Sequence, residues 1–182
     1  AEHGIWTECG VTGDSTQGSD IEDFINMHES TADQIFICNT NKRGWYFRGA
    51  NDSFITNVQI KSTGWAGFSF PTGATFANGG LKVGTLHAYG TNMAVGDPDG
   101  YCIDLPSTLM ADRLYVDSPP KNGIRLGSAN HINRVYINFR NSLAAAAYWG
   151  VVVEGPGNTI ASIKINDVFQ LPLPPTPLDG GC

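Results

Sequence analysis

The 182-residue sequence has little charge: charged residues make up only 15% of it, with 11 Lys and Arg against 17 Asp and Glu. It has no block of Lys and Arg, so it lacks the cations that neutralise the phosphates of nucleic acids or of anionic membrane surfaces. It also lacks an apolar run of the ~18 to 20 residues that a membrane-spanning helix needs. We therefore expect neither a nucleic acid nor a membrane as a partner.

Motifs of the common enzyme classes are absent as well. There is no P-loop, no Gly-x-Ser-x-Gly, no His-Glu-x-x-His and no Rossmann fingerprint. Four cysteines stand singly at positions 9, 38, 102 and 182, without the spacing of zinc or redox sites. Two disulfides in any of three pairings stay open, but free, partly buried thiols are the prediction.

What the chain does have is 22 glycines and many short stretches in which apolar and polar residues alternate. Helical proteins usually place Glu, Lys, Ala and Leu on their solvent-facing turns, and this composition does not suit that pattern. Alternation with a period of two is typical of strands with one buried face. The sequence therefore predicts an all-β protein.

Two interleaved series of apolar-x-apolar triplets repeat along the chain, at steps of 21 to 28 residues in the first and 23 to 31 in the second. The centres of the first series are Phe36, Gln59, His87, Tyr115, Tyr136 and Lys164. Those of the second are Tyr46, Ser69, Ala94, Arg125 and Val152. Such a period predicts a parallel β-solenoid of about six coils, with the centres facing outward in columns. An antiparallel sandwich is the alternative.

Different features mark the two ends of the predicted solenoid. Ser19 and Glu22 form a capping box before apolar residues at helical spacing, which predicts a helix that covers the first coil. The end of the chain is rich in Pro, which cannot donate ladder hydrogen bonds. We therefore divide the chain into an N-terminal segment with the capping helix (1–34), a parallel β-helix (35–170) and a Pro-rich tail (171–182).

Three segments carry a family resemblance. Residues 10–25 begin Gly-Val-Thr-Gly-Asp-Ser-Thr, and residues 129–135 and 157–163 share the pattern Asn-x-Ile-x-x-Val/Ile. They resemble the N-terminal motif and the coil starts of the pectate-lyase-like right-handed β-helix superfamily, in particular phage tailspikes. Ser15 replaces a glycine of that motif, whose acidic portion is shortened. The resemblance covers about residues 10–168 and implies a virion or extracellular location, a homotrimer and other virion or fibre proteins as partners.

The first column mixes aromatic and hydrogen-bonding groups, which stack on sugar rings and pair with their hydroxyls. The substrate-binding candidates are His87, Tyr115, Tyr136 and Trp149. The leading hypothesis is a phage tailspike or receptor-binding component that recognises a bacterial surface polysaccharide through the solenoid. Tyr and His also suit a face covered by a neighbouring subunit, and that alternative stays open.

Carboxylates gather between Asp97 and Asp117. Glycoside hydrolysis needs two carboxyls about 5 to 9.5 Å apart, which Asp104 and Asp117 on neighbouring coils would supply. The catalytic candidates are Asp104, Asp117, Asp99 and Arg125. A polysaccharide lyase or glycoside hydrolase is thus the alternative function, and a structural spacer in a fibre or capsid is the third. Whether the chain is an enzyme stays open, since Asp97-Pro98-Asp99-Gly100 is also an ordinary turn sequence.

A lyase would also need cations near an acidic sugar. Arg113, Arg125, His131 and Arg134 fall on neighbouring coils, where they would clamp a uronate or form solvated coil edges. We predict no metal site and no cofactor. The spacing of Asp97, Asp99 and Asp104 leaves calcium open without matching an EF-hand.

Overall fold

The structure, a computed structural model, describes most of the central part of the chain. The described residues are 5–7, 27–28, 31–47, 50–69, 81–91, 100–105, 108–120, 122–139 and 149–166. Within these ranges the regular secondary structure consists of β-strands alone, as the sequence predicts. The expected capping helix lies outside them, apart from Met27 and His28, which form strand β2. The Pro-rich tail lies outside them too.

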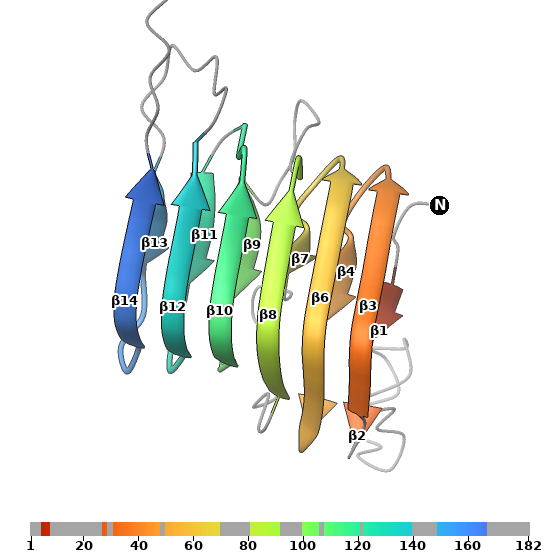
Figure 1. The fold of residues 1–182 in the computed structure, drawn as a ribbon. Coiled ribbons are helices and arrows are strands. Elements are labelled where there is room, and N and C mark those ends of the chain that lie inside the picture. Colours follow the sequence, from red (N-terminus) through yellow and green to blue (C-terminus); the bar gives the residue numbers. More distant parts are fainter. Residues whose placement is uncertain are drawn as a thin grey trace, which may run out of the picture.

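Two six-stranded parallel sheets make up the described structure (Figure 1). The long sheet has the order β14-β12-β10-β8-β6-β3 and contains β3 (Thr31–Thr40), β6 (Ser53–Thr63), β8 (Leu81–Tyr89), β10 (Met110–Asp117), β12 (His131–Asn138) and β14 (Thr159–Asn166). The short sheet has the order β1-β4-β7-β9-β11-β13 and contains β1 (Ile5–Thr7), β4 (Trp45–Phe47), β7 (Phe68–Ser69), β9 (Tyr101–Leu105), β11 (Asn122–Leu126) and β13 (Val151–Val153). Strand β2 (Met27–His28) pairs with β5 (Ala50–Asn51).

The chain alternates between the two sheets, so each pass along the long sheet is followed by one along the short sheet behind it (Figure 1). Every strand pair in the described residues is parallel. This pairing rules out the antiparallel sandwich and is compatible with a β-helix. The core lies between the sheets.

The register confirms the first predicted column. Neighbouring strands of the long sheet place its six members directly side by side, in the order Phe36, Gln59, His87, Tyr115, Tyr136 and Lys164. The second column needs one correction. Asp104 of β9 lies between Ser69 and Arg125, in the position predicted for Ala94. The triplet around Ala94 fits the period, but residues 92–99 lie outside the described residues and β9 supplies the short-sheet strand of that coil.

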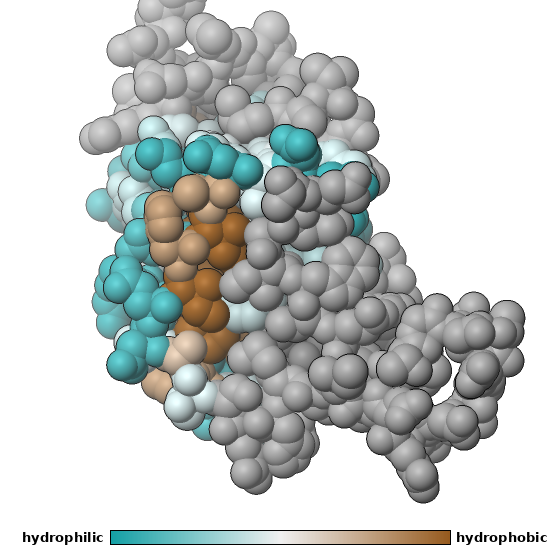
Figure 2. Space-filling model, turned by 90° about the vertical axis from the view of Figure 1, so that its right-hand side faces the viewer, coloured by the Kyte–Doolittle hydropathy of each residue, from teal (hydrophilic) through white to brown (hydrophobic). Residues whose placement is uncertain are grey.

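Inward-facing side chains stack into a continuous apolar core. Leu86, Leu114 and Ile124 are 0% exposed, and burying a side chain of that size stabilises the fold by about 1.5–3 kcal/mol. At the last strand the equivalent side chains Ile163 and Ile165 are 50% and 46% exposed, because no described strand lies beyond β14. A strip of apolar surface is also visible at the opposite end, on the side where β3 lies (Figure 2).

A bend runs across the long sheet at the same level in each strand. In β10, the consecutive residues Asp112 and Arg113 both face outward, between the buried Ala111 and Leu114. The same pattern recurs in β12, where Asn133 and Arg134 are exposed. Two outward residues in a row interrupt the alternation of a flat strand, so the sheet turns there and presents two outer surfaces.

The turns at the ends of the long-sheet strands repeat one conformation. Asn39 and Ser62 are the last residues but one of β3 and β6, Gly90 and Ser118 directly follow β8 and β10, and the φ angles of these four residues are 56°, 55°, 53° and 54°. Residues other than Gly, Asn and Asp rarely adopt this left-handed region, so its recurrence reflects the stacking of one turn on the next.

An asparagine ladder joins the turns that lead back into the long sheet. Asn130 is 0% exposed. Its amide nitrogen donates to the Leu105 carbonyl (3.3 Å) and to Oδ1 of Asn158 (2.9 Å), one coil further along. Its own Oδ1 accepts from the Leu109 N–H (3.1 Å). These two asparagines are the ones that begin the two repeated coil starts in the sequence, and they satisfy backbone groups that the turns would otherwise bury unpaired.

Glycine is required where the short-sheet strands begin. A Cβ on Gly123 would lie 2.5 Å from the carbonyl oxygen of Gly150 in the next coil, so the chains approach too closely for a side chain. Cys38 is exposed and is a free thiol, as predicted, whereas Cys102 is buried with its Sγ 3.7 Å from the Thr91 carbonyl oxygen. Cys9 and Cys182 lie outside the described residues.

Replacing Asn130 with Ala is expected to lower the free energy of unfolding by about 2–4 kcal/mol, because the buried Leu109 N–H loses its partner while the Leu105 carbonyl and Asn158 Oδ1 each lose one of two hydrogen bonds. Denaturant unfolding with an unchanged slope measures this loss. The control is Asn133→Ala, which removes one exposed hydrogen bond to Asp112 and should cost less than about 0.5 kcal/mol. Equal losses in the two variants would contradict the role of the ladder.

Candidate functional site

The outer face of the long sheet carries the candidate site. Its strands hold five of the 11 cationic side chains: Lys61, Lys82, Arg113, Arg134 and Lys164. They hold three of the 17 carboxylates: Asp33, Asp112 and Asp117. Five cations against three carboxylates give this face a net charge of +2, although the whole chain has −6. Cations are therefore concentrated on one face of an acidic protein.

Three aromatic side chains at the centre of this face form a ladder across β8, β10 and β12. The rings of His87 and Tyr115 stack with centroids 4.2 Å apart and 10° between their planes. Tyr136 meets Tyr115 edge to face, at 4.9 Å and 69°. We call His87, Tyr115 and Tyr136 the aromatic ladder. Its rings are half-buried and fixed against each other, so they form a preorganised apolar surface between strands.

Polar groups of β10, β12 and β14 lie beside the aromatic ladder. Asp117 accepts hydrogen bonds from Asn138 (3.1 Å) and from Ser118 (3.3 Å). The hydroxyl of Tyr136 accepts from the amide of Asn166 (2.5 Å), and the ammonium of Lys164 lies 5.7 Å from the same ring. A rigid ring surface with hydrogen-bonding groups at its edge matches the alternating apolar faces and hydroxyls of a sugar.

Burial and a nearby charge shift the pKa values of two side chains of the aromatic ladder, His87 and Tyr115. Burial lowers the pKa of His87 below 6.5, and the charge of Asp117 only partly offsets this effect. Its Nε2 atom is buried and has no hydrogen-bond partner among the described residues. Burial, followed by the charge of Asp117, raises the pKa of Tyr115 above 10.0. Both side chains are therefore held in their neutral forms near neutral pH.

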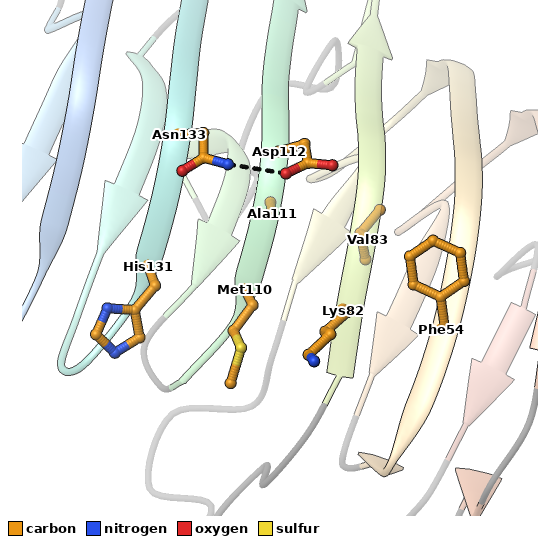
Figure 3. A pocket seen from close by; sticks show the side chains of 8 residues that line it. All are labelled: Phe54, Lys82, Val83, Met110, Ala111, Asp112, His131 and Asn133. Atoms are coloured by element: carbon orange, nitrogen blue, oxygen red, sulfur yellow. Dashed lines mark hydrogen bonds between the residues drawn. The ribbon is translucent and has the colours of Figure 1, made fainter.

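A groove of about 290 Å³ lies on the other side of the bend (Figure 3). Phe54, Lys82, Met110 and His131 line it from four neighbouring strands, in register. Asn133 donates to Asp112 (2.8 Å) at its edge, the bond drawn in Figure 3. Phe54 is 44% exposed. Sequence reasoning missed Phe54, Lys82 and Met110, although their register with His131 follows from the same period.

The structure brings two of the predicted catalytic candidates together, Asp104 and Arg125 on the short sheet, and places Asp117 on the long sheet. Arg125 grips Asp104 with both ends of its guanidinium: Nε lies 2.7 Å from one carboxylate oxygen and a terminal nitrogen 2.6 Å from the other. Asp104 is 2% exposed and projects from the short sheet, whereas Asp117 projects from the long sheet. The core separates the two sheets, and packed sheets lie about 10 Å apart.

Asp104 and Arg125 are instead a buried ion pair within the short sheet. Their register places them directly side by side on β9 and β11. The hydrogen bond to Asp104 has the largest influence on Arg125 and raises the pKa of its guanidinium above the usual value. Such a pair specifies the register of its strands, because a slip would leave the charges buried without partners.

Trp149, the remaining substrate-binding candidate, lies away from the aromatic ladder. Trp149 is 68% exposed and precedes β13; its N–H donates to the side chain of Asn122 (2.9 Å) in β11. Because this hydrogen bond comes from the backbone N–H of Trp149 and β11 is a short-sheet strand, Trp149 lies on the short-sheet side of the molecule. Asp97 and Asp99 lie outside the described residues, so the calcium set that includes them remains a prediction.

Comparisons with known proteins yield no relative. No family model, no curated protein and no solved structure matches the chain. In the part that the structure describes, no three His, Cys, Asp or Glu side chains gather as a metal site would require. The same residues contain no helix of the length and apolarity needed to cross a membrane.

The lowered pKa of His87 predicts a pH dependence of stability. The unfolded chain binds the proton more tightly than the folded one, so stability is present above about pH 6.5 and is lost as the pH falls below it. The variant His87→Gln should therefore lose less stability than the wild type between about pH 7.5 and about pH 5.5. Thermal unfolding at both pH values measures the difference, with the exposed His131→Gln as the matched control. An unchanged pH dependence in His87→Gln would contradict the burial of a neutral imidazole.

Proposed function

We propose that the chain is a right-handed parallel β-helix of the pectate-lyase-like type that recognises a bacterial surface polysaccharide through the outer face of its long sheet. The observation that supports this most is the aromatic ladder. Three rings from successive coils form a rigid surface with amide, carboxylate and ammonium groups at its border. A linear polymer with a repeating unit suits a surface that repeats from coil to coil.

The family resemblance of the sequence supports a proposal for the biological role, the assembly and the location of the protein. We propose that it serves as a tailspike or receptor-binding component of a phage, as a homotrimer, in a virion or another extracellular setting. Both ends of the long sheet favour further protein neighbours, because apolar side chains such as Ile163 are half-exposed there. Other virion or fibre proteins would be its partners.

Recognition is favoured over cleavage of the polysaccharide. Arg125 binds both carboxylate oxygens of Asp104, so this side chain is engaged within the short sheet. Asp117 is left on the other sheet with hydrogen bonds to Asn138 and Ser118. Asp104 and Asp117 project from different sheets, so this pair does not favour the lyase or hydrolase alternative.

The proposal predicts that Tyr115→Ala weakens binding to the recognised glycan by roughly tenfold or more, because a sugar ring loses its stacking partner. A glycan array identifies the ligand, and calorimetry on the folded variants gives the affinities. Tyr115→Phe keeps the ring and should retain most of the affinity. Tyr46→Ala, on the short sheet, is the control and should bind as the wild type does.

Two results would contradict the proposal. One is a strict monomer by light scattering that binds no glycan on the array. The other is a glycan whose affinity falls in Tyr46→Ala but not in Tyr115→Ala, because recognition would then belong to the short sheet.

A further inference from the structure

Two arginines lie directly side by side on the outer face of the long sheet. Arg113 of β10 pairs in register with Arg134 of β12, and both side chains are exposed. Neighbouring strands are about 4.8 Å apart, and like charges directly opposite each other destabilise a sheet. Within the described part of the chain, neither guanidinium has an ion-pair partner within 4.0 Å. The pair therefore has an unfavourable interaction that an anion would remove.

A hollow of about 390 Å³ lies beside this pair. Its lining consists of Thr56, Gly84, Thr85, Asp112, Arg113 and Arg134. At Gly84 the wall has no side chain, and none would fit, because a Cβ would lie 2.4 Å from the carbonyl oxygen of Thr56. The carboxylate of Asp112 accepts the hydrogen bond from Asn133. We call this the arginine hollow.

The arginine hollow adjoins the aromatic ladder. Arg113 and Tyr115 are two residues apart on β10, as Arg134 and Tyr136 are on β12, so each arginine faces the same side as the ring next to it. A sugar ring on the ladder would thus direct its substituents toward two guanidiniums. Guanidinium groups bind planar carboxylates and phosphates through paired, charge-assisted hydrogen bonds.

We propose that the arginine hollow binds the anionic group, a carboxylate or a phosphate, of an acidic polysaccharide whose sugar ring stacks on the aromatic ladder. This inference rests on the proposed function and narrows its ligand to acidic glycans. The surplus of cations on this face of an otherwise acidic chain favours the same ligand.

The test compares charged polymers with their neutral counterparts. One arm uses a uronate-containing polysaccharide and the same polymer after reduction of its carboxyls to alcohols. The other uses a phosphodiester-containing polysaccharide and its dephosphorylated form. The double variant Arg113→Gln/Arg134→Gln should bind one of the anionic polymers roughly tenfold more weakly or worse, with unchanged binding to its neutral form. The arm that shows the loss identifies the anionic group.

The matched control removes two cations elsewhere. Lys42 and Arg43 follow β3 and contact the rings of Trp65 and Tyr46, outside the outer face of the long sheet, and Lys42→Gln/Arg43→Gln changes the net charge equally. It should bind within about twofold of the wild type, apart from weak screening effects. Equal losses in both double variants would overturn the inference, because only the total charge would then matter.

Two further outcomes separate the inference from the proposed function. If the wild type binds the neutral polymers as tightly as the charged ones, the inference fails and the proposed function stands. If the wild type binds none of the polymers, and Tyr115→Ala changes no binding on a wider array, both fail together.

Discussion

The in-register pairing of parallel strands is the interaction on which the rest of this structure depends. A single coil cannot cover its own apolar side chains, so Leu86 and Leu114 are fully buried only because a strand lies on either side of each. A slip of one residue would turn them toward solvent. Two polar devices oppose such a slip: the Asn130–Asn158 ladder and the Asp104–Arg125 ion pair both connect adjacent coils and are satisfied only in the observed register.

The same register builds the outer face. Side chains that are 21 to 28 residues apart in sequence become neighbours, and the chemistry of the face depends on which of them meet. His87, Tyr115 and Tyr136 meet as stacked rings, whereas Arg113 and Arg134 meet as like charges. The first arrangement is favourable in the folded chain alone, and the second becomes favourable with an anion between the guanidiniums. The inward columns thus supply stability, and the outward columns form the proposed recognition surface.

The spacing of the first triplet series was enough to predict the first column. Each triplet has two apolar residues that must face the core, so its central residue must face outward. The same period placed Ala94 where the structure has Asp104, since an insertion between coils changes the spacing without disturbing the core. Asp104 was a catalytic candidate because carboxylates gather between Asp97 and Asp117 in the sequence. Its ion pair with Arg125 becomes visible only once β9 is aligned with β11. The groove at Phe54 was missed because a single aromatic residue in a sequence does not indicate a groove until the residues on the neighbouring strands are known.

The central claim is that the outer face of the long sheet is the recognition surface, and radical footprinting of the glycan-bound protein tests it most directly. Oxidation of Tyr115 and Tyr136 on the long sheet is compared with that of Tyr46 and Tyr101 on the short sheet, with and without bound polysaccharide. Recognition by the long sheet predicts protection of the first two and unchanged labelling of the other two. Protection of Tyr46 and Tyr101 alone would contradict it and place the ligand on the opposite face.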